Sequence, residues 1–383
     1  MKKKTLALLM AASITAAILA GCGSDGSGTS AGSTESTEDA TKDMEQTEDT
    51  AQTEDTTQAS DDEAVDVGSD SDGAVYKVGI VQFVDDASLN QIESAIEKEL
   101  DAKAAELGVT FNYSDYTYNG QADSTVLNQI ATELIASEVD VIVPIATPAA
   151  MIMQNATEDN QIPVVFSAVS DPEGSGLVAS NTAPGSNITG TSDALNTDAV
   201  MDLIFAANPN ITKVGLLYSK SEDSSRLPVE AAKAYCKAKG VEVVEKTGTT
   251  NDEVSLAADA LIAEGVEAVF TPTDNTVMTA ELAIYEKFID AGVPHYCGAD
   301  SFALNGAFLG YGVNYEELGT ATADMVVEIL VNGADPASTA VVMLDNGIAT
   351  VNTETAEAIG LDYSMFAGMC DELKEITTAL EFE

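Results

Sequence analysis

The pattern of apolar and polar residues changes at Val75. From there on, short runs rich in β-branched and aromatic residues alternate with longer runs in which apolar residues recur at helical spacing. The pattern predicts strands over residues 75–84, 109–116, 139–145 and 162–169, and helices over residues 88–107, 124–137 and 148–157. Gly108 stands where the first helix should end. Strands that alternate with helices are typical of an α/β fold with parallel sheets.

The chain repeats this pattern once. Residues 78–81, 108–109, 139–143 and 162–164 have counterparts in the same order at residues 214–217, 240–241, 266–270 and 293–295. One match would be weak, because short apolar strands look alike, but four in order indicate two similar lobes of roughly 130 residues each. We therefore predict two doubly wound, Rossmann-like lobes. Ligands of open α/β sheets bind beyond the carboxyl ends of the strands, so a ligand cleft is expected between the lobes.

Polar side chains follow the strands that should end at this cleft. In the first lobe, Thr147 is placed to cap a helix and Pro148 to occupy its first position. The free N–H groups and the positive dipole end of that helix would suit a carboxylate, with the Thr147 hydroxyl as a further donor. A plain helix cap without a ligand is the alternative interpretation.

The second lobe has a counterpart after its third strand. There Asp274 could accept hydrogen bonds from a ligand ammonium, and Asn275 could bond to the ligand's polar groups. A helix N-cap is again the alternative. Together the two lobes fit a zwitterion, with its carboxylate at Thr147 and its ammonium near Asp274, Asp171 or Asp300.

Composition limits the possible partners and chemistry. The 383 residues include 64 acidic and 16 basic side chains, a net charge of −48, so the surface should repel nucleic acid and anionic lipid. Cys236, Cys297 and Cys370 lack CxxC spacing, which argues against a disulfide framework and a zinc site, and the first two fit small core positions. His295, the only histidine, stands in an apolar strand pattern. We expect no metal, no cofactor and no enzyme activity, because no metal-ligand cluster, phosphate loop or folded nucleophile motif is present.

The N-terminus resembles that of an exported lipoprotein. Lysines at positions 2–4 precede an apolar stretch over residues 5–20, which is short for a membrane span of about 20 residues. The stretch ends in Leu19-Ala20-Gly21-Cys22, a run that resembles the lipobox of bacterial lipoproteins. The resemblance implies a signal peptide over residues 1–21 and a lipid on Cys22 that holds the protein at the extracytoplasmic face of the cell membrane. An ordinary secretory signal that ends in cysteine is the alternative.

A polar segment separates Cys22 from the first strand. Residues 22–74 consist mainly of Gly, Ser, Thr, Gln, Asp and Glu, and QTEDT at 46–50 recurs at 52–56. Such a segment buries too little apolar surface to offset its chain entropy, so we predict a disordered acidic tether. No later stretch is long and apolar enough to span a bilayer, which leaves the lipid as the expected membrane anchor.

Five stretches together resemble one known family. They are VGIVQFV at 78–84, IATPAA at 145–150, FSAVSDP at 166–172, NITGTSD at 187–193 and PTDNTV at 272–277. They resemble ABC transporter substrate-binding proteins of the family that includes tryptophan- and tyrosine-binding lipoproteins, over residues 75–363. The resemblance implies a type I periplasmic-binding-protein fold with three crossovers, near Asp193, Asp300 and Gly333. The N-terminal lobe would comprise residues 75–192 and 301–333, including the strand at 309–312. The C-terminal lobe would comprise residues 193–300 and 334–363, followed by a helix or tail at 364–383.

The resemblance also implies a set of ligand-binding residues. They are Gln82, Phe83, Thr147, Pro148, Ala149, Ser170, Asp171, Asp193, Thr273, Asp274, Asn275 and Asp300. The sequence departs from the family pattern at two places near this pocket. Asp86-Ala87 stands where the family has His-Pro, and Ala299-Asp300-Ser301 where it often has Gly-Glu-Glu. The ligand can therefore differ from that of the best-known members.

The function implied is the capture of a small ligand, most simply an aromatic amino acid, and its delivery to the permease subunits of an ABC importer. Closure of the lobes around the ligand would be a hinge motion that the permease recognises. A sensor that presents its ligand to a signalling receptor would share these sequence features and is the alternative. We expect a monomer.

Overall fold

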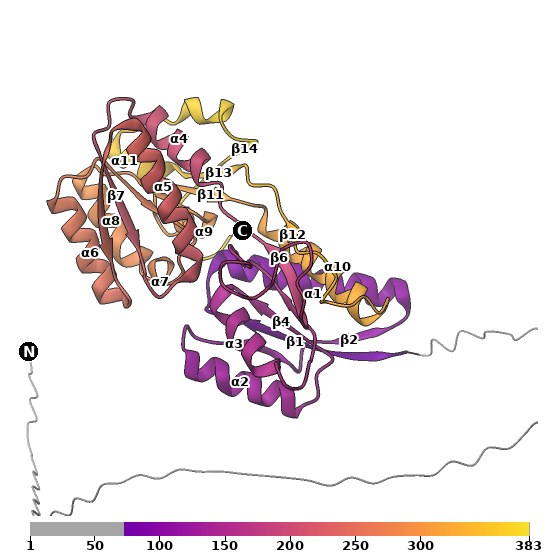
Figure 1. Cartoon of the computed structure of the whole chain (residues 1–383). Helices are drawn as coiled ribbons and strands as arrows, with labels where there is room; N and C mark the ends of the chain where they lie inside the picture. The colour runs from indigo at the N-terminus through magenta and orange to yellow at the C-terminus, as the bar shows by residue number, and fades with distance from the viewer. Residues whose placement is uncertain (1–72, 383) are drawn as a thin grey trace, which may run out of the picture. The chain divides into compact units, whose positions relative to one another are not determined.

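Two α/β lobes make up the part of the chain that the structure describes. The computed structural model describes residues 73–382, and each lobe has a seven-stranded, mainly parallel sheet flanked by helices (Figure 1). The predicted fold class is thereby confirmed. The predicted signal peptide, Cys22 and the tether up to residue 72 lie outside the described residues. Between residues 73 and 382, no helix combines the length and the apolar character that a membrane crossing requires.

The N-terminal lobe is built on a sheet with the strand order β12-β6-β5-β4-β1-β2, in which β3 also pairs with β1. Its strands are β1 (Val75–Gln82), β2 (Thr110–Asn112), β3 (Thr117–Asn119), β4 (Val141–Ile145), β5 (Val164–Phe166), β6 (Ile188–Ser192) and β12 (Val342–Met343). Its helices are α1 (Ala87–Leu107), α2 (Ser124–Ala136), α3 (Thr147–Thr157) and α10 (Tyr315–Leu330). The strand predicted over 109–116 is divided, because the Tyr116 N–H donates to the Tyr113 carbonyl at 2.8 Å and turns the chain.

The C-terminal lobe has the strand order β14-β13-β11-β10-β9-β7-β8. Its strands are β7 (Lys213–Tyr218), β8 (Glu242–Thr247), β9 (Ala268–Thr271), β10 (His295–Cys297), β11 (Leu309–Gly312), β13 (Ile348–Asn352) and β14 (Glu372–Ile376). Its helices are α4 (Thr197–Ala207), α5 (Arg226–Lys239), α6 (Asn251–Ala263), α7 (Asn275–Met278), α8 (Glu281–Ala291), α9 (Asp300–Leu304) and α11 (Thr353–Ile359), with short 3₁₀ turns η1 (Asp223–Ser225) and η2 (Ser364–Gly368). β13 runs antiparallel to β11, and the other pairs are parallel.

The predicted repeat is visible in the strand order. The series β2-β1-β4-β5-β6 in one sheet corresponds to β8-β7-β9-β10-β11 in the other. The four sequence matches lie on these corresponding strands or directly before them. Gly108 ends α1 and Gly240 ends α5, both in the left-handed conformation (φ 69° and 73°) that costs glycine little.

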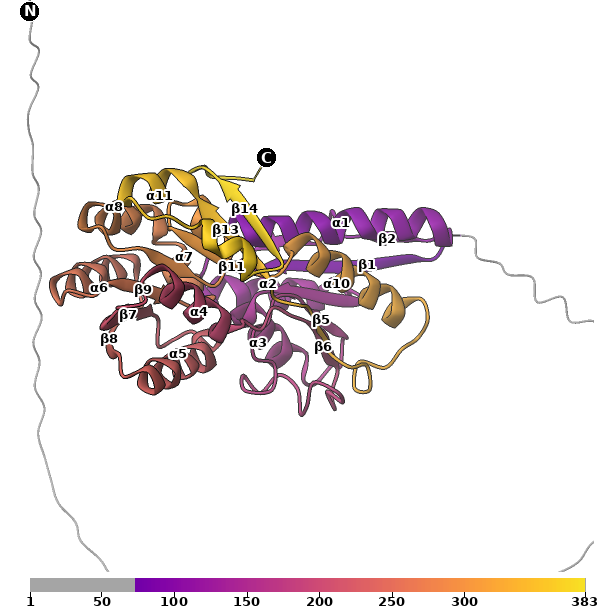
Figure 2. The same ribbon diagram turned by 90° about the horizontal axis from the view of Figure 1, so that it is seen from above.

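The second crossover lies later than predicted. β11 pairs with β10 and with β13, so it belongs to the C-terminal sheet. The assignment of residues 309–312 to the first lobe is therefore wrong, and the chain crosses between Gly312 and Tyr315 rather than near Asp300. The helix that follows, α10, lies beside α1 in the N-terminal lobe as predicted, as Figures 1 and 2 both show. The first crossover is at Asp193, between β6 and α4, as predicted.

The third crossover and the C-terminus also differ from the prediction. β12 pairs with β6, so the chain leaves the N-terminal lobe between Met343 and Ile348 rather than near Gly333. The segment predicted as a helix or tail contains β14, which pairs in parallel with β13 at the edge of the C-terminal sheet. Short strands such as β12 and β14 are held by backbone hydrogen bonds to partners remote in sequence, and the local residue pattern carries little sign of them.

Candidate functional site

A cavity lies between the carboxyl ends of the strands of the two sheets. In this closed form its volume is small, about 20 Å³. It is lined by Ser88, Leu89, Ala146, Thr147, Ala168, Ser170, Asp193 and Tyr315 on the N-terminal side, and by Ser224, Thr273, Asn275, Met278 and Ala299 on the C-terminal side. Five of the predicted site residues meet here, namely Thr147, Ser170, Asp193, Thr273 and Asn275. A wider groove beside α1 and α10 contains none of the predicted residues.

The hydroxyl of Thr147 is available to a ligand. The structure corrects its predicted role as an N-cap, because Ala146 occupies that position and α3 begins at Thr147 itself. The Thr147 side chain is buried, yet Oγ1 has no hydrogen-bond partner among the described residues. A buried hydroxyl without a partner costs about 1–3 kcal/mol. Thr147 lines the cavity at the start of α3, so a hydrogen bond from this hydroxyl to a ligand acceptor could offset that cost.

Two alanines of the cavity wall have strained backbones. Ala146 follows β4 and has φ 81°, and Ala168 follows β5 and has φ 55°. Residues with a side chain rarely adopt this left-handed region, at a cost of about 1–3 kcal/mol each. Strain of this kind concentrates at ligand sites, and here it shapes two neighbouring strand ends that face the cavity.

Asp193 supplies a carboxylate to the cavity. It follows β6 at the first crossover, is only 4% exposed, and accepts a hydrogen bond from Ser170 Oγ at 2.9 Å. Burial raises the pKa of Asp193 to about 6. A ligand ammonium would stabilise the charged carboxylate, so Asp193 is well placed to bind a cationic group.

Asp274 is not a ligand group in this structure. It is fully buried and accepts hydrogen bonds from Ser219 N (2.7 Å), Ser225 Oγ (2.6 Å) and Val277 N (2.9 Å), which makes it the N-cap of α7. It does not line the cavity. The alternative interpretation of this residue as a helix cap therefore holds, and the ammonium site predicted there is corrected.

Asn275, the next residue, does face the cavity. Its Nδ2 donates to Glu222 Oε2 at 3.0 Å, and Thr276 Oγ1 donates to the other carboxylate oxygen at 3.2 Å. Glu222 is 6% exposed, and burial together with the charge of Asp274 raises its pKa to about 7. Glu222 thus orients Asn275 from behind. No local pattern indicates this role, because Glu222 lies in a loop among other polar residues.

Asp171 and Asp300 connect the lobes instead of lining the cavity. Asp171 Oδ2 is 2.6 Å from Nη2 of Arg226, which belongs to the C-terminal lobe. Asp300, at the start of α9, accepts a hydrogen bond from Ser88 Oγ of α1 at 2.6 Å. Both predicted ammonium partners are therefore occupied by residues of the opposite lobe, and the lobes touch directly at both positions.

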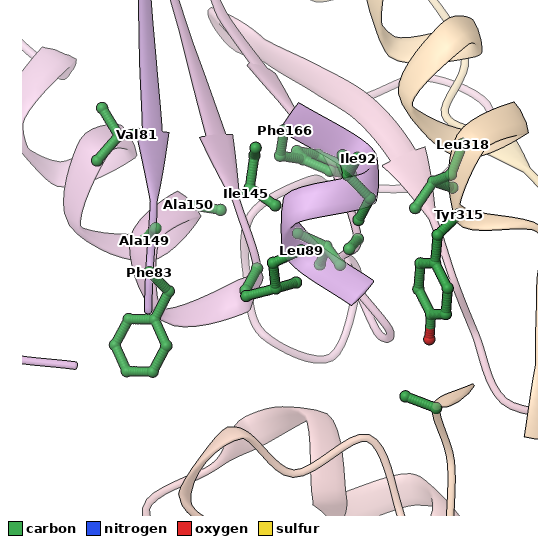
Figure 3. Packing of buried hydrophobic residues seen from close by; sticks show 14 of the residues in the cluster. Val81, Phe83, Leu89, Ile92, Ile145, Ala149, Ala150, Phe166, Tyr315 and Leu318 are labelled. Atoms are coloured by element: carbon green, nitrogen blue, oxygen red, sulfur yellow. The ribbon is translucent and has the colours of Figure 1, made fainter. Parts of the chain in front are cut away.

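Four other predicted residues also lie outside the cavity lining. Both ends of the Gln82 amide are bonded within the lobe, since Nε2 donates to Asn90 Oδ1 at 2.6 Å and Oε1 accepts from Asn119 Nδ2 at 3.1 Å. Phe83 belongs to the hydrophobic core at the end of β1 (Figure 3). Ala149 is fully buried in the same core, and Pro148 supports the first turn of α3.

Tyr315 is the most informative lining residue that the sequence did not identify. It opens α10 directly after the second crossover. Figure 3 shows its ring next to Leu318, with the hydroxyl pointing away from the core. Burial raises its pKa well above the ordinary value. The correct position of the second crossover would have revealed it, as the first crossover revealed Asp193.

The remaining titratable candidates are structural. His295 is buried, with Nε2 2.7 Å from Thr271 Oγ1 and Nδ1 3.0 Å from Glu281 Oε1, which confirms its predicted place in the core. Cys236 and Cys297 are buried and unpaired, also as predicted. Within the described residues, no group of three His, Cys, Asp or Glu side chains could hold a metal ion.

Comparison with known proteins gives a consistent result. A family model described as ABC transporter substrate binding protein matches residues 77–365. A tyrosine-binding protein of Clostridioides difficile is 31% identical over 284 residues, which cover 74% of this chain and 81% of that protein.

Two solved structures are similar to the chain at 29% identity. One is an ABC domain from Streptococcus pneumoniae in complex with L-Trp, with a TM-score of 0.72 over 78% of this chain and 100% of that one. The other is the ligand-free, open form of a substrate-binding protein with adhesive properties from Clostridium difficile, with a TM-score of 0.61 over 79% and 100%. At equal identity the chain superposes better on the complex than on the open form, in agreement with the direct contacts between its lobes.

Proposed function

The chain belongs to the ABC transporter substrate-binding protein family, and we propose that its ligand is an L-amino acid with an aromatic side chain. Members of this family act on the extracytoplasmic side and serve import, which favours delivery to a permease over presentation to a signalling receptor. The observation that carries the proposal is the unpartnered Thr147 hydroxyl, which is buried in the same cavity as the acidic Asp193.

The cavity offers complementary groups to a zwitterion. The ligand carboxylate would lie at the first turn of α3, where the helix dipole and the Thr147 hydroxyl both favour negative charge. The ligand ammonium would lie at Asp193, whose carboxylate has Ser170 as its side-chain donor. Binding at these two groups would relieve an unsatisfied hydroxyl and a buried charge at the same time.

The ligand side chain would lie against the apolar part of the wall. Leu89, Met278 and Tyr315 supply this surface. Sulfur and ring contacts with an aromatic side chain are each favourable by about 0.3–1.5 kcal/mol beyond the area buried. The tyrosine-binding relative and the L-Trp complex support this choice of side chain.

Fluorescence tests the proposal directly. The chain contains no tryptophan, so emission excited selectively in tryptophan comes from added L-Trp alone. We expect polarised and shifted emission on binding, and a thermal shift equivalent to about 2.7 kcal/mol at a ligand concentration 100-fold above Kd. L-Tyr and L-Phe are tested by competition. Absence of both signals with all three amino acids would refute the aromatic ligand. Ligand recovered unchanged after long incubation is expected, because the protein acts by binding and not by catalysis.

We further propose that Cys22 carries a lipid and that the mature protein is a monomer held at the membrane by that lipid. The lipobox-like run and the preceding apolar stretch support the anchor. Cells that express the Cys22→Ala variant should lose incorporation of labelled palmitate and release the protein from the membrane fraction. Retention of label in that variant would refute the assignment. Light scattering of the protein in solution tests the monomer.

A further inference from the structure

One contact between the lobes joins a serine hydroxyl to a carboxylate, and ligand binding alone does not require it. Ser88 Oγ, near the start of α1 in the N-terminal lobe, donates to Asp300 Oδ1 at 2.6 Å and accepts from the Ser301 N–H at 3.1 Å. Asp300 and Ser301 begin α9 in the C-terminal lobe. Gln91 Nε2 adds a longer bond to Asp300 Oδ2 at 3.4 Å. The two helix N-termini are thus joined through one buried hydroxyl.

A second carboxylate stands on the N-terminal side of this contact. Asp86 is the N-cap of α1 and accepts from the Ser88 N–H at 2.9 Å and the Leu89 N–H at 3.4 Å. Asp86 is only 8% exposed, and the charge of Asp300 contributes to raising its pKa. Closure of the lobes therefore brings Asp86 and Asp300 from opposite lobes into one buried site.

The surroundings do not neutralise this pair. The charge of Lys374 of β14 acts on Asp300 and lowers its pKa, and both carboxylates, together with Asp193, act on Tyr315 of α10. Lys374 lies near Asp300 only, and no ion pair joins it to either carboxylate in the described part of the chain. Asp86 and Asp300 both bond to Ser88, so their carboxylates lie close together, and such a pair is more stable with one proton than with none.

We propose that Asp86, Ser88 and Asp300 form a proton-linked clasp, in which closure of the lobes takes up one proton and holds the ligand more tightly at mildly acidic pH. The proposal rests on the proposed binding function and adds a control on it. Both carboxylates occur where the sequence departs from the family pattern, at Asp86-Ala87 and at Ala299-Asp300-Ser301. The clasp is therefore a feature of this chain.

The direction of the pH effect follows from the closed state. Burial, with a smaller contribution from the charge of Asp300, raises the pKa of Asp86 to about 7, and burial also raises the pKa of Asp300. With the lobes apart, each carboxylate would face water and lose the desolvation that raises its pKa. The closed form thus binds the proton more tightly, and its advantage is lost as the pH rises towards and through 7. The clasp proton alone should make affinity about tenfold higher at pH 6 than at pH 8.

Two variants separate the clasp from other effects. Asp86→Asn keeps the shape and the helix cap but removes the charge, because Asn and Asp cap helices equally well. We expect it to bind L-Trp at pH 8 as tightly as the unchanged protein does at pH 6, with little pH dependence between them. Asp123→Asn is the matched control, since Asp123 caps α2 through the same two bonds, to Thr125 N and Val126 N, at an exposed position. It should keep the tenfold dependence.

Small-angle X-ray scattering of the full mature chain without ligand gives a separate measurement. We expect a smaller radius of gyration at pH 6 than at pH 8, and no such difference for Asp86→Asn. No amino-acid binding together with this pH-dependent compaction would refute the proposed ligand and support the clasp. Tight L-Trp binding with equal affinity at pH 6 and pH 8, or a pH dependence retained in Asp86→Asn, would overturn the clasp and leave the proposed function intact.

Discussion

The side chains of Arg226 and Asp171 meet across the two lobes, with Nη2 of the guanidinium 2.6 Å from Oδ2 of the carboxylate. Arg226 is the only arginine in the 383 residues. Its side chain is 51% exposed while that of Asp171 is 12% exposed, so the pair lies at the edge of the interface and is partly screened by water. The pair joins the two lobes directly, so separation of the lobes would break it.

Arg226→Gln should speed ligand release. An exposed ion pair contributes about 0.2–1 kcal/mol, so we expect Kd to rise by up to about fivefold, mostly through a faster dissociation rate. Stopped-flow displacement of L-Trp measures this rate. Lys233→Gln is the control, because Lys233 pairs with Glu230 and Glu245 within the C-terminal lobe. An equal dissociation rate in Arg226→Gln and the unchanged protein would show that the pair does not hold the closed form.

Gly174→Ala should break the same ion pair without touching either charge. A Cβ at this position would lie 1.8 Å from Asp171 Oδ2 and 2.1 Å from Arg226 Nη2, so one of the two side chains must move. We expect the rise in dissociation rate seen for Arg226→Gln, and no further rise in the double variant. Gly368→Ala, where an added Cβ meets nothing within 4 Å, is the matched control. Additive effects in the double variant would contradict this account.

Thr147→Val and Thr157→Val should have opposite effects, although both lie on α3. Thr147 Oγ1 has no partner in the described structure, whereas Thr157 Oγ1 donates to the Met153 carbonyl at 2.9 Å and accepts from Asn187 Nδ2 at 3.0 Å. Thr147→Val should leave the unfolding free energy of the ligand-free protein unchanged or higher, and weaken amino-acid binding by about tenfold or more. Thr157→Val should lower the unfolding free energy by about 1–3 kcal/mol and leave Kd unchanged.

Urea denaturation and ligand titration of both variants measure the two quantities. The contrast between the two variants in unfolding free energy and Kd tests the prediction better than either value alone. Loss of stability without loss of affinity in Thr147→Val would show that the hydroxyl has a structural partner and not a ligand.

The sequence predicted the lobes well because their strands repeat. The apolar runs of β1 and β7 and the glycines that end α1 and α5 are local signals, and both halves carry them in the same order. The second crossover was misplaced because Leu309–Gly312 is buried throughout and could extend either sheet. Which sheet such a strand joins depends on pairing with β10 and β13, which no local pattern records.

Part of the cavity lining follows from the sequence pattern. Thr147, Ser170 and Asn275 line the cavity after strands, since the carboxyl ends of parallel strands share one edge. The sequence does not show where each carboxylate points, because that depends on which hydrogen-bond donors lie nearby in the fold. Asp274 turns inward to three donors of its own lobe, while Asp171 turns to an arginine of the other lobe.

Asp193 should give binding a pH dependence opposite in sign to that of the clasp. Burial raises its pKa to about 6 in the ligand-free protein, and a bound ammonium favours its charged form. Protons therefore compete with the ligand, and affinity should fall by about tenfold from pH 7 to pH 5. The measurement is best made in the Asp86→Asn background, in which the clasp no longer contributes. Asp86→Asn/Asp193→Asn should bind at least about tenfold more weakly at pH 7, because a charge-assisted bond of about 1.5–3 kcal/mol is lost, and should show no further decline at pH 5. A decline that persists without the Asp193 carboxylate would place the ligand ammonium at another acid.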